Sequence, residues 1–262
     1  MFEYKKEIII LSIVVILTLL VVLTIKFLYF NEKSRIICSL STIPERVDRG
    51  TVNKTIKSLN EQTVKPDLIY INISNELNNK KYDLDKLNEM KKEHPNLVIN
   101  IIDKDIGPIT KIVPVIKYLQ NTDKLILVDD DVSYDNKTIE TLLKSKKQAV
   151  GFHGFKQNQN DEFNYVCDVP ETKEVDILET FHGVLYDAYI LKDLEEYNKS
   201  LNNKCFKQDD IKISKYLKIK GIKMFLIPKV KDMKTVHDAQ DTPELRNENL
   251  VDGNKNCFKE LF

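Results

Sequence analysis

The sequence predicts an α/β domain built on a mostly parallel β-sheet, and three observations support this prediction. Short apolar runs alternate with segments of helical periodicity, which is the pattern of repeated βα units. The run Leu125–Val128 is apolar throughout, as is typical of a strand buried on both faces. Asp129, Asp130 and Asp131 follow it directly. They mark the C-terminal end of that strand, the edge at which open α/β sheets bind ligands.

The other elements follow from apolar spacing and turn residues. Apolar runs predict strands at Ile36–Leu40, Leu68–Ile73, Leu97–Ile102, Leu125–Val128 and Met224–Ile227. Helical spacing predicts helices at Val47–Gln62, Leu84–Glu93, Lys111–Leu119, Thr138–Lys146 and Ile211–Lys220. Gly107-Pro108 forms a turn before the third helix, and Gly221 is suited to end the fifth. After Ala149 the regular alternation fades until the last helix.

The N-terminal segment differs from the rest of the chain. Residues 8–25 are apolar except for Ser12, Thr18 and Thr24, and a helix of about 20 apolar residues spans a bilayer. We therefore expect residues 1–34 to be a tail and membrane anchor, with a span of about 8–30, and residues 35–262 to form one domain. A cleaved signal peptide is the alternative, although its apolar core is usually shorter. Basic residues on both sides leave the orientation open.

Charge and composition exclude one class of partner. The chain of 262 residues has 40 basic and 40 acidic residues, so its formal net charge is zero. No basic block with interleaved aromatic residues occurs. We therefore expect no nucleic-acid partner.

The four cysteines are far apart and form no CxxC pair, so a zinc site is not expected. Cys38 lies in an apolar strand and is expected to be a buried thiol. Cys167 with Cys205, or either of them with Cys257, can form a disulfide in an oxidising compartment. The sequence does not choose between these pairings.

The three consecutive aspartates predict a cation site. Adjacent carboxylates repel one another, so a fold that gathers them at a strand end needs a compensating cation. Hard oxygen ligands suit Mg²⁺ or Mn²⁺, which in turn suit a diphosphate. Strand alternation sends Asp129 and Asp131 to the same side if the extended conformation persists. A solvated acidic turn before the next helix is the alternative.

Four segments, in this order, resemble the nucleotide-sugar glycosyltransferases of the GT-A fold, and more specifically family 2-like members with a DXD motif. They are Ser39–Arg46, Ser58–Gln62 with Pro66-Asp67, Asp105–Lys111, and Asp129–Asp131. The resemblance covers about residues 36–227 and is clearest through Asp135. It implies a GT-A, Rossmann-like fold for residues 35–262 and a hexosyltransferase-like activity.

The resemblance also implies donor-binding residues. Asp129 and Asp131 match the DXD motif, which holds a divalent metal, Mn²⁺ or Mg²⁺, on the donor diphosphate. His237 matches a C-terminal histidine that is the third metal ligand in many members, although a lone histidine is more often uninvolved. The candidates for binding the nucleotide-sugar, a UDP-sugar first of all, are Thr42, Arg46, Asp103, Gly107, Lys111 and Asp130. From the residues alone, Arg46 can equally be a surface ion-pair partner, and Lys111 a solvated lysine after a capped turn.

In the second half, the resemblance implies an acceptor-binding region. Glu179–Tyr186 resembles the acceptor-side loop, with His182 and Gly183 as candidates. Asp209 and Asp210 resemble the acidic element that supplies the catalytic base of inverting members; we expect Asp210 to be the base and Asp209 to orient or bind the acceptor. Because a helix N-terminus lowers the pKa of a carboxylate, a base there needs desolvation or a nearby carboxylate to raise it. Helix capping alone is the alternative for both residues.

The expected function is a membrane-anchored, metal-dependent glycosyltransferase that moves a sugar from a nucleotide-sugar to a glycan, lipid or protein acceptor. This function favours a single-pass, type II protein with its large domain lumenal or extracytoplasmic. A nucleotidyltransferase shares the sheet and its acidic strand end. A non-catalytic anchored binding module gains support if Asp209 and Asp210 lie far from Asp131. Whether transfer inverts or retains configuration is left open.

Overall fold

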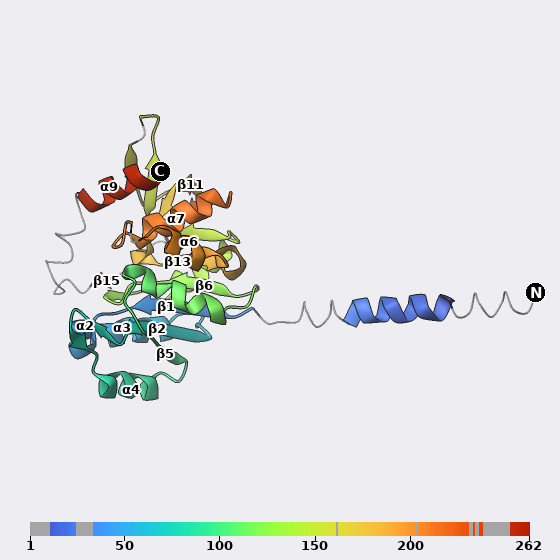
Figure 1. Ribbon diagram of the computed structural model, residues 1–262, viewed down its shortest axis with the longest axis horizontal. Helices are drawn as coiled ribbons and strands as arrows, with labels where there is room; N and C mark the ends of the chain where they lie inside the picture. Colours follow the sequence, from blue (N-terminus) through green and yellow to red (C-terminus); the bar gives the residue numbers. More distant parts are fainter. Residues whose placement is uncertain are drawn as a thin grey trace, which may run out of the picture. The chain divides into compact units, whose positions relative to one another are not determined.

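The computed structural model describes residues 11–24, 34–160, 162–202, 204–230, 233, 236–237 and 252–262. The chain divides into two compact units, Met1–Ser34 and Arg35–Phe262 (Figure 1).

In the first unit, residues 11–24 form a helix. The predicted span of residues 8–30 extends on both sides into residues outside the described part. At about 1.5 Å per residue the described stretch is about 21 Å long, whereas the hydrocarbon core of a bilayer is about 30 Å thick. No helix among the described residues is long and apolar enough to cross a membrane. This finding contradicts the prediction of a single-pass, type II membrane protein.

The second unit is built on an eight-stranded sheet in the order β11-β14-β8-β13-β6-β1-β2-β5 (Figure 1). Its strands are β1 Ile36–Ser41, β2 Leu68–Ser74, β5 Leu97–Ile102, β6 Lys124–Leu127, β8 Ala149–Gly151, β11 Lys173–Val175, β13 Val184–Asp187 and β14 Met224–Leu226. The pairs β6-β1, β1-β2, β2-β5 and β8-β14 are parallel. β13 is antiparallel to both β6 and β8, and β11 is antiparallel to β14. The predicted mostly parallel α/β sheet is confirmed.

The helices lie around this sheet (Figure 1). They are α2 Pro44–Asp48, α3 Thr51–Asn60, α4 Leu84–Glu93, α5 Thr138–Lys144, α6 Leu194–Ser200, α7 Asp209–Ile219 and α9 Asp252–Leu261, with the 3₁₀ helices η1 Pro108–Lys111, η2 Val113–Tyr118, η3 Thr180–His182 and η4 Ala188–Leu191. The prediction for α4 is confirmed residue for residue. Helix α7 begins two residues earlier than predicted, so that Asp209 and Asp210 lie in its first turn.

Two of the predicted helices are not single α-helices in the structure. The helix expected over Val47–Gln62 is divided into α2 and α3 at Gly50, whose φ of 74° is left-handed. The helix expected over Lys111–Leu119 is replaced by η1 and η2. Pro108 and Pro114 lie at the starts of these short helices, and a proline nitrogen cannot donate the hydrogen bond that a continuous α-helix requires.

The irregular stretch after Ala149 contains short strands that the apolar spacing did not predict. Three of these strands, β8, β11 and β13, belong to the large sheet. Three others form a separate sheet in the order β10-β9-β12. Its strands are β10 Phe163–Val166, β9 Gly154–Gln157 and β12 Ile177–Leu178. Two further small ladders pair β15 Val236–His237 with β7 Val132–Ser133, and β3 Glu76–Leu77 with β4 Lys80–Lys81. Strands of two to four residues are too short for a period of two to be recognised.

The core lies on both faces of the large sheet. Ile37 and Cys38 are neighbours in β1 but belong to different clusters of buried apolar side chains, as strand alternation requires. Cys38 is fully buried and is a free thiol, as predicted. The disulfide left open by the sequence joins Cys205 to Cys257, and Cys167 is free.

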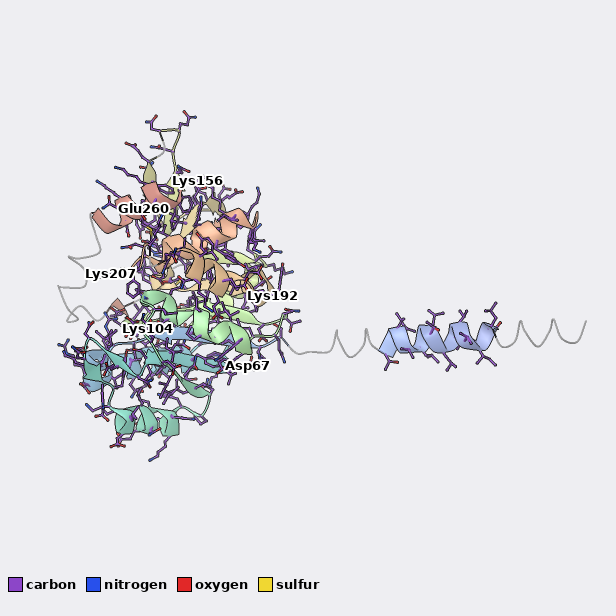
Figure 2. The ribbon with its side chains drawn as sticks, in the orientation of Figure 1. Asp67, Lys104, Lys156, Lys192, Lys207 and Glu260 are labelled. Atoms are coloured by element: carbon purple, nitrogen blue, oxygen red, sulfur yellow. A yellow bond between two sulfur atoms is a disulfide. The ribbon has the colours of Figure 1, made fainter. Side chains whose placement is uncertain are left out.

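The surface carries charged side chains of both signs. Figure 2 shows examples on several sides of the second unit, among them Lys104, Lys192 and Glu260, which are all exposed. Basic and acidic residues are equal in number over the whole chain, 40 of each.

Candidate functional site

The three aspartates lie where β6 leads into β7. Strand β6 ends at Leu127, and Asp130 and Asp131 form a turn. The prediction that Asp129 and Asp131 point to the same side required an extended chain, and the chain is not extended there. Arg46 of α2 pairs with Asp130, and its Nη2 lies 2.8 Å from Oδ2 of Asp131. Burial raises the pKa of Asp130 to about 6, although the Arg46 guanidinium opposes this shift. Arg46 is thus an ion-pair partner, but a largely buried one.

Lys111 contacts both the acidic turn, which we define as Asp129–Asp131, and the start of α7. Its Nζ lies 2.6 Å from Oδ1 of Asp129 and 3.1 Å from Oδ2 of Asp209, and it donates a hydrogen bond of 3.0 Å to Oγ1 of Thr180. Burial by itself lowers the pKa of Lys111, but the carboxylates of Asp129, Asp209 and Asp210 raise it well above its ordinary value. Lys111 is therefore a buried, charged ammonium. The alternative of a solvated lysine is wrong.

The backbone around Lys111 is held from two sides. Gly107 has a φ of 79°, and a Cβ at this position would lie 2.7 Å from the carbonyl oxygen of Phe206, so only glycine permits this approach. Ser39 of β1 donates a hydrogen bond of 2.6 Å to the carbonyl oxygen of Lys111, and Asn72 of β2 donates one of 2.8 Å to the Ser39 hydroxyl. These contacts set the position from which the Lys111 side chain reaches the carboxylates.

Asp209 and Asp210 begin α7 and face different partners. Asp209 contacts Lys111, whereas Oδ2 of Asp210 accepts a long hydrogen bond of 3.4 Å from the backbone N–H of Thr180. Burial raises the pKa of Asp210 well above its ordinary value, and the neighbouring Asp209 adds to this shift, while Lys111 opposes it. Both conditions that a base at a helix N-terminus needs, desolvation and a nearby carboxylate, are therefore present.

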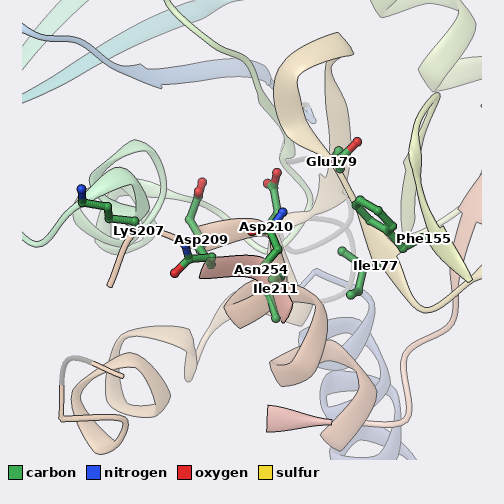
Figure 3. Close-up of a pocket in the computed structure, with 9 residues that line it drawn as sticks. Phe155, Ile177, Glu179, Lys207, Asp209, Asp210, Ile211 and Asn254 are labelled. Carbon is green, nitrogen blue, oxygen red and sulfur yellow. The ribbon is translucent and has the colours of Figure 1, made fainter. Parts of the chain in front are cut away.

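A cavity of about 80 Å³ opens beside these two carboxylates (Figure 3). It lies between the start of α7, the ends of β9 and β12, and α9. The lining residues are Phe155, Ile177, Glu179, Lys207, Gln208, Asp209, Asp210, Ile211 and Asn254. Segments from distant parts of the sequence therefore form one enclosure around Asp210.

Glu179 is a lining residue to which the sequence assigned no role. Burial raises its pKa to about 7, and the negative charge of Asp129 adds to the shift. Its charge also contributes to the raised pKa of Asp210. The signal that was available is the position of Glu179 as the first residue of the predicted acceptor-side loop, but the cavity that it lines is formed with β9 and α7, which lie elsewhere in the sequence.

Replacing Glu179 with Gln is expected to stabilise the fold at alkaline pH and to have little effect at acidic pH. The stability associated with protonated Glu179 is complete below the unfolded pKa of about 4.5 and is lost as pH rises through the folded value of about 7. At about 1.4 kcal/mol per pKa unit, the loss is at most about 3.5 kcal/mol. Urea unfolding at pH 5 and pH 8 measures it. Glu174→Gln, which alters an exposed carboxylate on β11, is the control and should behave alike at both pH values. Equal stability of Glu179→Gln and the wild type at pH 8 would contradict the expectation.

The loop with His182 and Gly183 lies next to the acidic turn. The Tyr134 hydroxyl accepts a hydrogen bond of 2.8 Å from the backbone N–H of Asp129 and donates one of 3.1 Å to the carbonyl just before His182. The His182 ring stacks on that of His153 with centroids 3.9 Å apart. Gly183 has a φ of 92°, which favours glycine. His182 thus packs in an aromatic cluster, while Tyr134 ties its loop to Asp129.

Two donor-side candidates lie away from Lys111. Thr42 is buried at the end of β1, where its carbonyl accepts a hydrogen bond of 2.8 Å from the Tyr82 hydroxyl, and its side chain acts on Asp130 of the acidic turn and lowers the pKa of that carboxyl. Asp103 follows β5 and is exposed. Both lie at the C-terminal edge of the parallel strands, but the structure does not bring them to Lys111.

The residues predicted to hold a metal are only partly described. Among the described side chains, no group of three or more His, Cys, Asp or Glu could hold a metal ion. The side chain of His237 lies outside this description, but its backbone pairs with Val132, the residue directly after Asp131. Asp129 and Asp131 each face a cation, Lys111 and Arg46 respectively. Hard carboxylate oxygens with a neighbouring histidine suit Mn²⁺ or Mg²⁺.

The fold is similar to that of solved glycosyltransferases. With the crystal structure of GalNAc-T7 with UDP, GalNAc and Mn²⁺, the TM-score is 0.58 at 14% sequence identity, over 79% of this chain and 44% of that one. With the mannosyltransferase PcManGT from Pyrobaculum calidifontis, in complex with GDP-Man and Mn²⁺, it is 0.50 at 10% identity, over 77% of this chain and 56% of that one.

The chain therefore spans about half the length of each of these structures. No protein-family model matches the sequence, and no curated protein matches it. At such low identity the likeness shows the fold, which is the GT-A fold that the four sequence segments predicted.

Proposed function

We propose that this chain is a metal-dependent glycosyltransferase that moves a sugar from a nucleotide-sugar, a UDP-sugar first of all, to a hydroxyl of a glycan, lipid or protein. One observation carries the proposal: Lys111 contacts both Asp129 of the acidic turn and Asp209 at the start of α7. The candidate donor and acceptor residues thus share one centre. Their separation would have favoured a non-catalytic binding module.

The acidic turn is the proposed donor side. Asp129 and Asp131, with His237 as a further ligand, would hold Mn²⁺ or Mg²⁺. When bound, the ion neutralises the negative charge that develops on the leaving diphosphate. Both structures compared above contain Mn²⁺ with a nucleotide, which supports this assignment. Arg46 holds the turn in place through its two ion pairs.

The other donor-side candidates keep the roles expected for them. Thr42, Asp103 and Asp130 would contact the nucleoside, and Gly107, by letting Phe206 approach the backbone, would help to position Lys111 for the donor. Lys111 would place its positive charge next to the diphosphate, since its ammonium is held at the acidic turn.

The start of α7 is the proposed acceptor side, with His182 and Gly183 near it. As the acceptor oxygen forms its bond to the anomeric carbon, the bond from that carbon to the diphosphate oxygen breaks, and its electron pair leaves with the nucleoside diphosphate. In transfer with inversion, Asp210 takes the proton of the acceptor hydroxyl. Burial raises its pKa and so makes its carboxylate a stronger base. Asp209, held by Lys111, would orient the acceptor.

A donor panel tests the proposal. The full chain is incubated with UDP-GlcNAc, UDP-GalNAc or GDP-mannose, each with and without MnCl₂, and the melting temperature and released nucleotide are measured. At a donor concentration of about 100 times Kd, binding stabilises the fold by about 2.7 kcal/mol. We expect this stabilisation only with Mn²⁺ and a matching donor, together with release of a nucleoside diphosphate.

Two outcomes reject the proposal. Release of pyrophosphate from nucleotide substrates would identify a nucleotidyltransferase. Absence of stabilisation and of product with every donor would favour a binding module.

A further inference from the structure

The C-terminal helix α9 is attached to the part of the chain that forms the cavity. The disulfide Cys205–Cys257 links it to the segment leading into α7. The Phe258 ring stacks on Phe163 with centroids 4.3 Å apart, and it meets Phe155 edge to face at 5.7 Å. Covalent and aromatic contacts therefore define where α9 lies relative to the cavity.

Helix α9 contributes one polar side chain to the cavity wall. Asn254 lines the cavity together with Asp210, Glu179 and Phe155 (Figure 3). Its amide offers both donors and an acceptor. No residue of α9 resembles a motif, so the sequence did not single out this side chain.

The chemistry of the lining selects a class of ligand. Three of the lining residues carry carboxyl groups: Glu179, Asp209 and Asp210. Oδ1 of Asp210 is buried and has no hydrogen-bond partner among the described residues. An unpaired buried acceptor costs free energy until it meets a donor. Hydroxyl groups supply such donors, and the Phe155 ring supplies an apolar surface for the C–H groups of a sugar. Lys207 is the one basic residue in the described part of the lining, so acidic groups outnumber basic groups by three to one, and the lining does not favour a phosphate or carboxylate.

The size of the cavity limits how much of a ligand it admits. A volume of about 80 Å³ is several times the space of about 10–15 Å³ that one water needs. This space holds the hydroxyl-bearing edge of one sugar ring, and the rest of an acceptor would lie outside it.

We propose that this cavity is the subsite for a neutral, hydroxyl-rich acceptor sugar, and that Asn254 of α9 is a specificity-determining residue in it. The inference rests on the proposed transferase function. It adds that the acceptor group next to the transferred sugar carries no negative charge. It also adds that the C-terminal helix, and not only the α/β sheet, selects the acceptor.

The test compares two asparagines of the same helix. Asn254 lines the cavity, whereas Asn256 is exposed and does not. The full chain and the variants Asn254→Ala and Asn256→Ala are mixed with UDP and MnCl₂ and probed by saturation-transfer NMR. The neutral probes are N-acetylglucosamine, N-acetylgalactosamine and mannose, and the anionic probes are glucuronate and glucose 6-phosphate. Circular dichroism checks that each variant is folded.

We expect at least one neutral sugar to bind the wild type and Asn256→Ala, with affinity reduced about tenfold or more in Asn254→Ala. Neither anionic probe should compete with it. Equal binding to all three proteins, preferential binding of an anionic probe, or no binding of any neutral sugar overturns the inference.

Donor hydrolysis separates this inference from the proposed function. Release of UDP from UDP-GlcNAc or UDP-GalNAc, or of GDP from GDP-mannose, is measured in parallel for the wild type and Asn256→Ala. If the donors are hydrolysed but no sugar binding depends on Asn254, the subsite alone is rejected. If no donor is hydrolysed and sugar binding depends on Asn254, the transferase is rejected and the sugar subsite stands.

Discussion

Replacing Asp131 with Asn is expected to reduce Mn²⁺-dependent release of nucleoside diphosphate by about 100-fold to 1,000-fold. Metal stabilisation of a leaving group contributes several kcal/mol, and each 1.36 kcal/mol changes a rate about tenfold. Asp131 is partly exposed and its partner is Arg46, so the fold should tolerate the change. Electron paramagnetic resonance of Mn²⁺ should show weaker binding of the ion by the variant in the presence of UDP.

The control for this prediction is Asp187→Asn. Asp187 ends β13 and pairs with Lys124, so it resembles Asp131 in being a carboxylate paired with a basic residue. It lies opposite Lys124 at the start of β6, and hence at the other edge of the sheet. Asp187→Asn should keep both Mn²⁺ binding and turnover. Wild-type turnover in Asp131→Asn would remove this carboxylate from the proposed mechanism.

Replacing Asp210 with Asn is expected to reduce sugar transfer by about 100-fold to 10,000-fold, the range for loss of a general base. An amide cannot accept the acceptor's proton, although it preserves the shape of the side chain. Because burial raises the pKa of Asp210, the wild-type rate should rise with pH as this carboxyl loses its proton, and the variant should lack that rise. Transfer rates between pH 5 and pH 9, with donor binding measured separately, test both points.

Asp176→Asn is the matched control for Asp210. Asp176 is also a largely buried carboxylate, but it pairs with Lys156 at 3.2 Å and does not line the cavity. Its replacement should leave the pH profile unchanged. A product that retains the anomeric configuration, or full activity of Asp210→Asn, would contradict the assignment of Asp210 as the base of a direct displacement.

Local sequence patterns predicted the elements that are long and periodic. The helix at Leu84–Glu93 and the parallel strands near Ile36, Leu68 and Leu97 agree with the structure because their apolar spacing persists over several residues. Strands β9 and β12 were missed because they have only four and two residues. Their positions depend on pairing with each other and on the segments packed over them.

The membrane prediction was also wrong. It relied on the apolar composition of residues 8–30, of which the structure describes a helix at residues 11–24, and no helix among the described residues is long and apolar enough to cross a membrane.

The sequence by itself determined the α/β class, the five strands β1, β2, β5, β6 and β14, and the acidic residues that follow β6 and begin α7. Only the tertiary structure decided that Lys111 lies between Asp129 and Asp209, that Glu179 is buried beside Asp210, and that Cys205 pairs with Cys257. The physical reason is how far apart in the sequence the interacting residues lie. Helices and strands arise from neighbouring residues, but burial, charge compensation and disulfide pairing depend on which distant segments meet when the sheet is assembled.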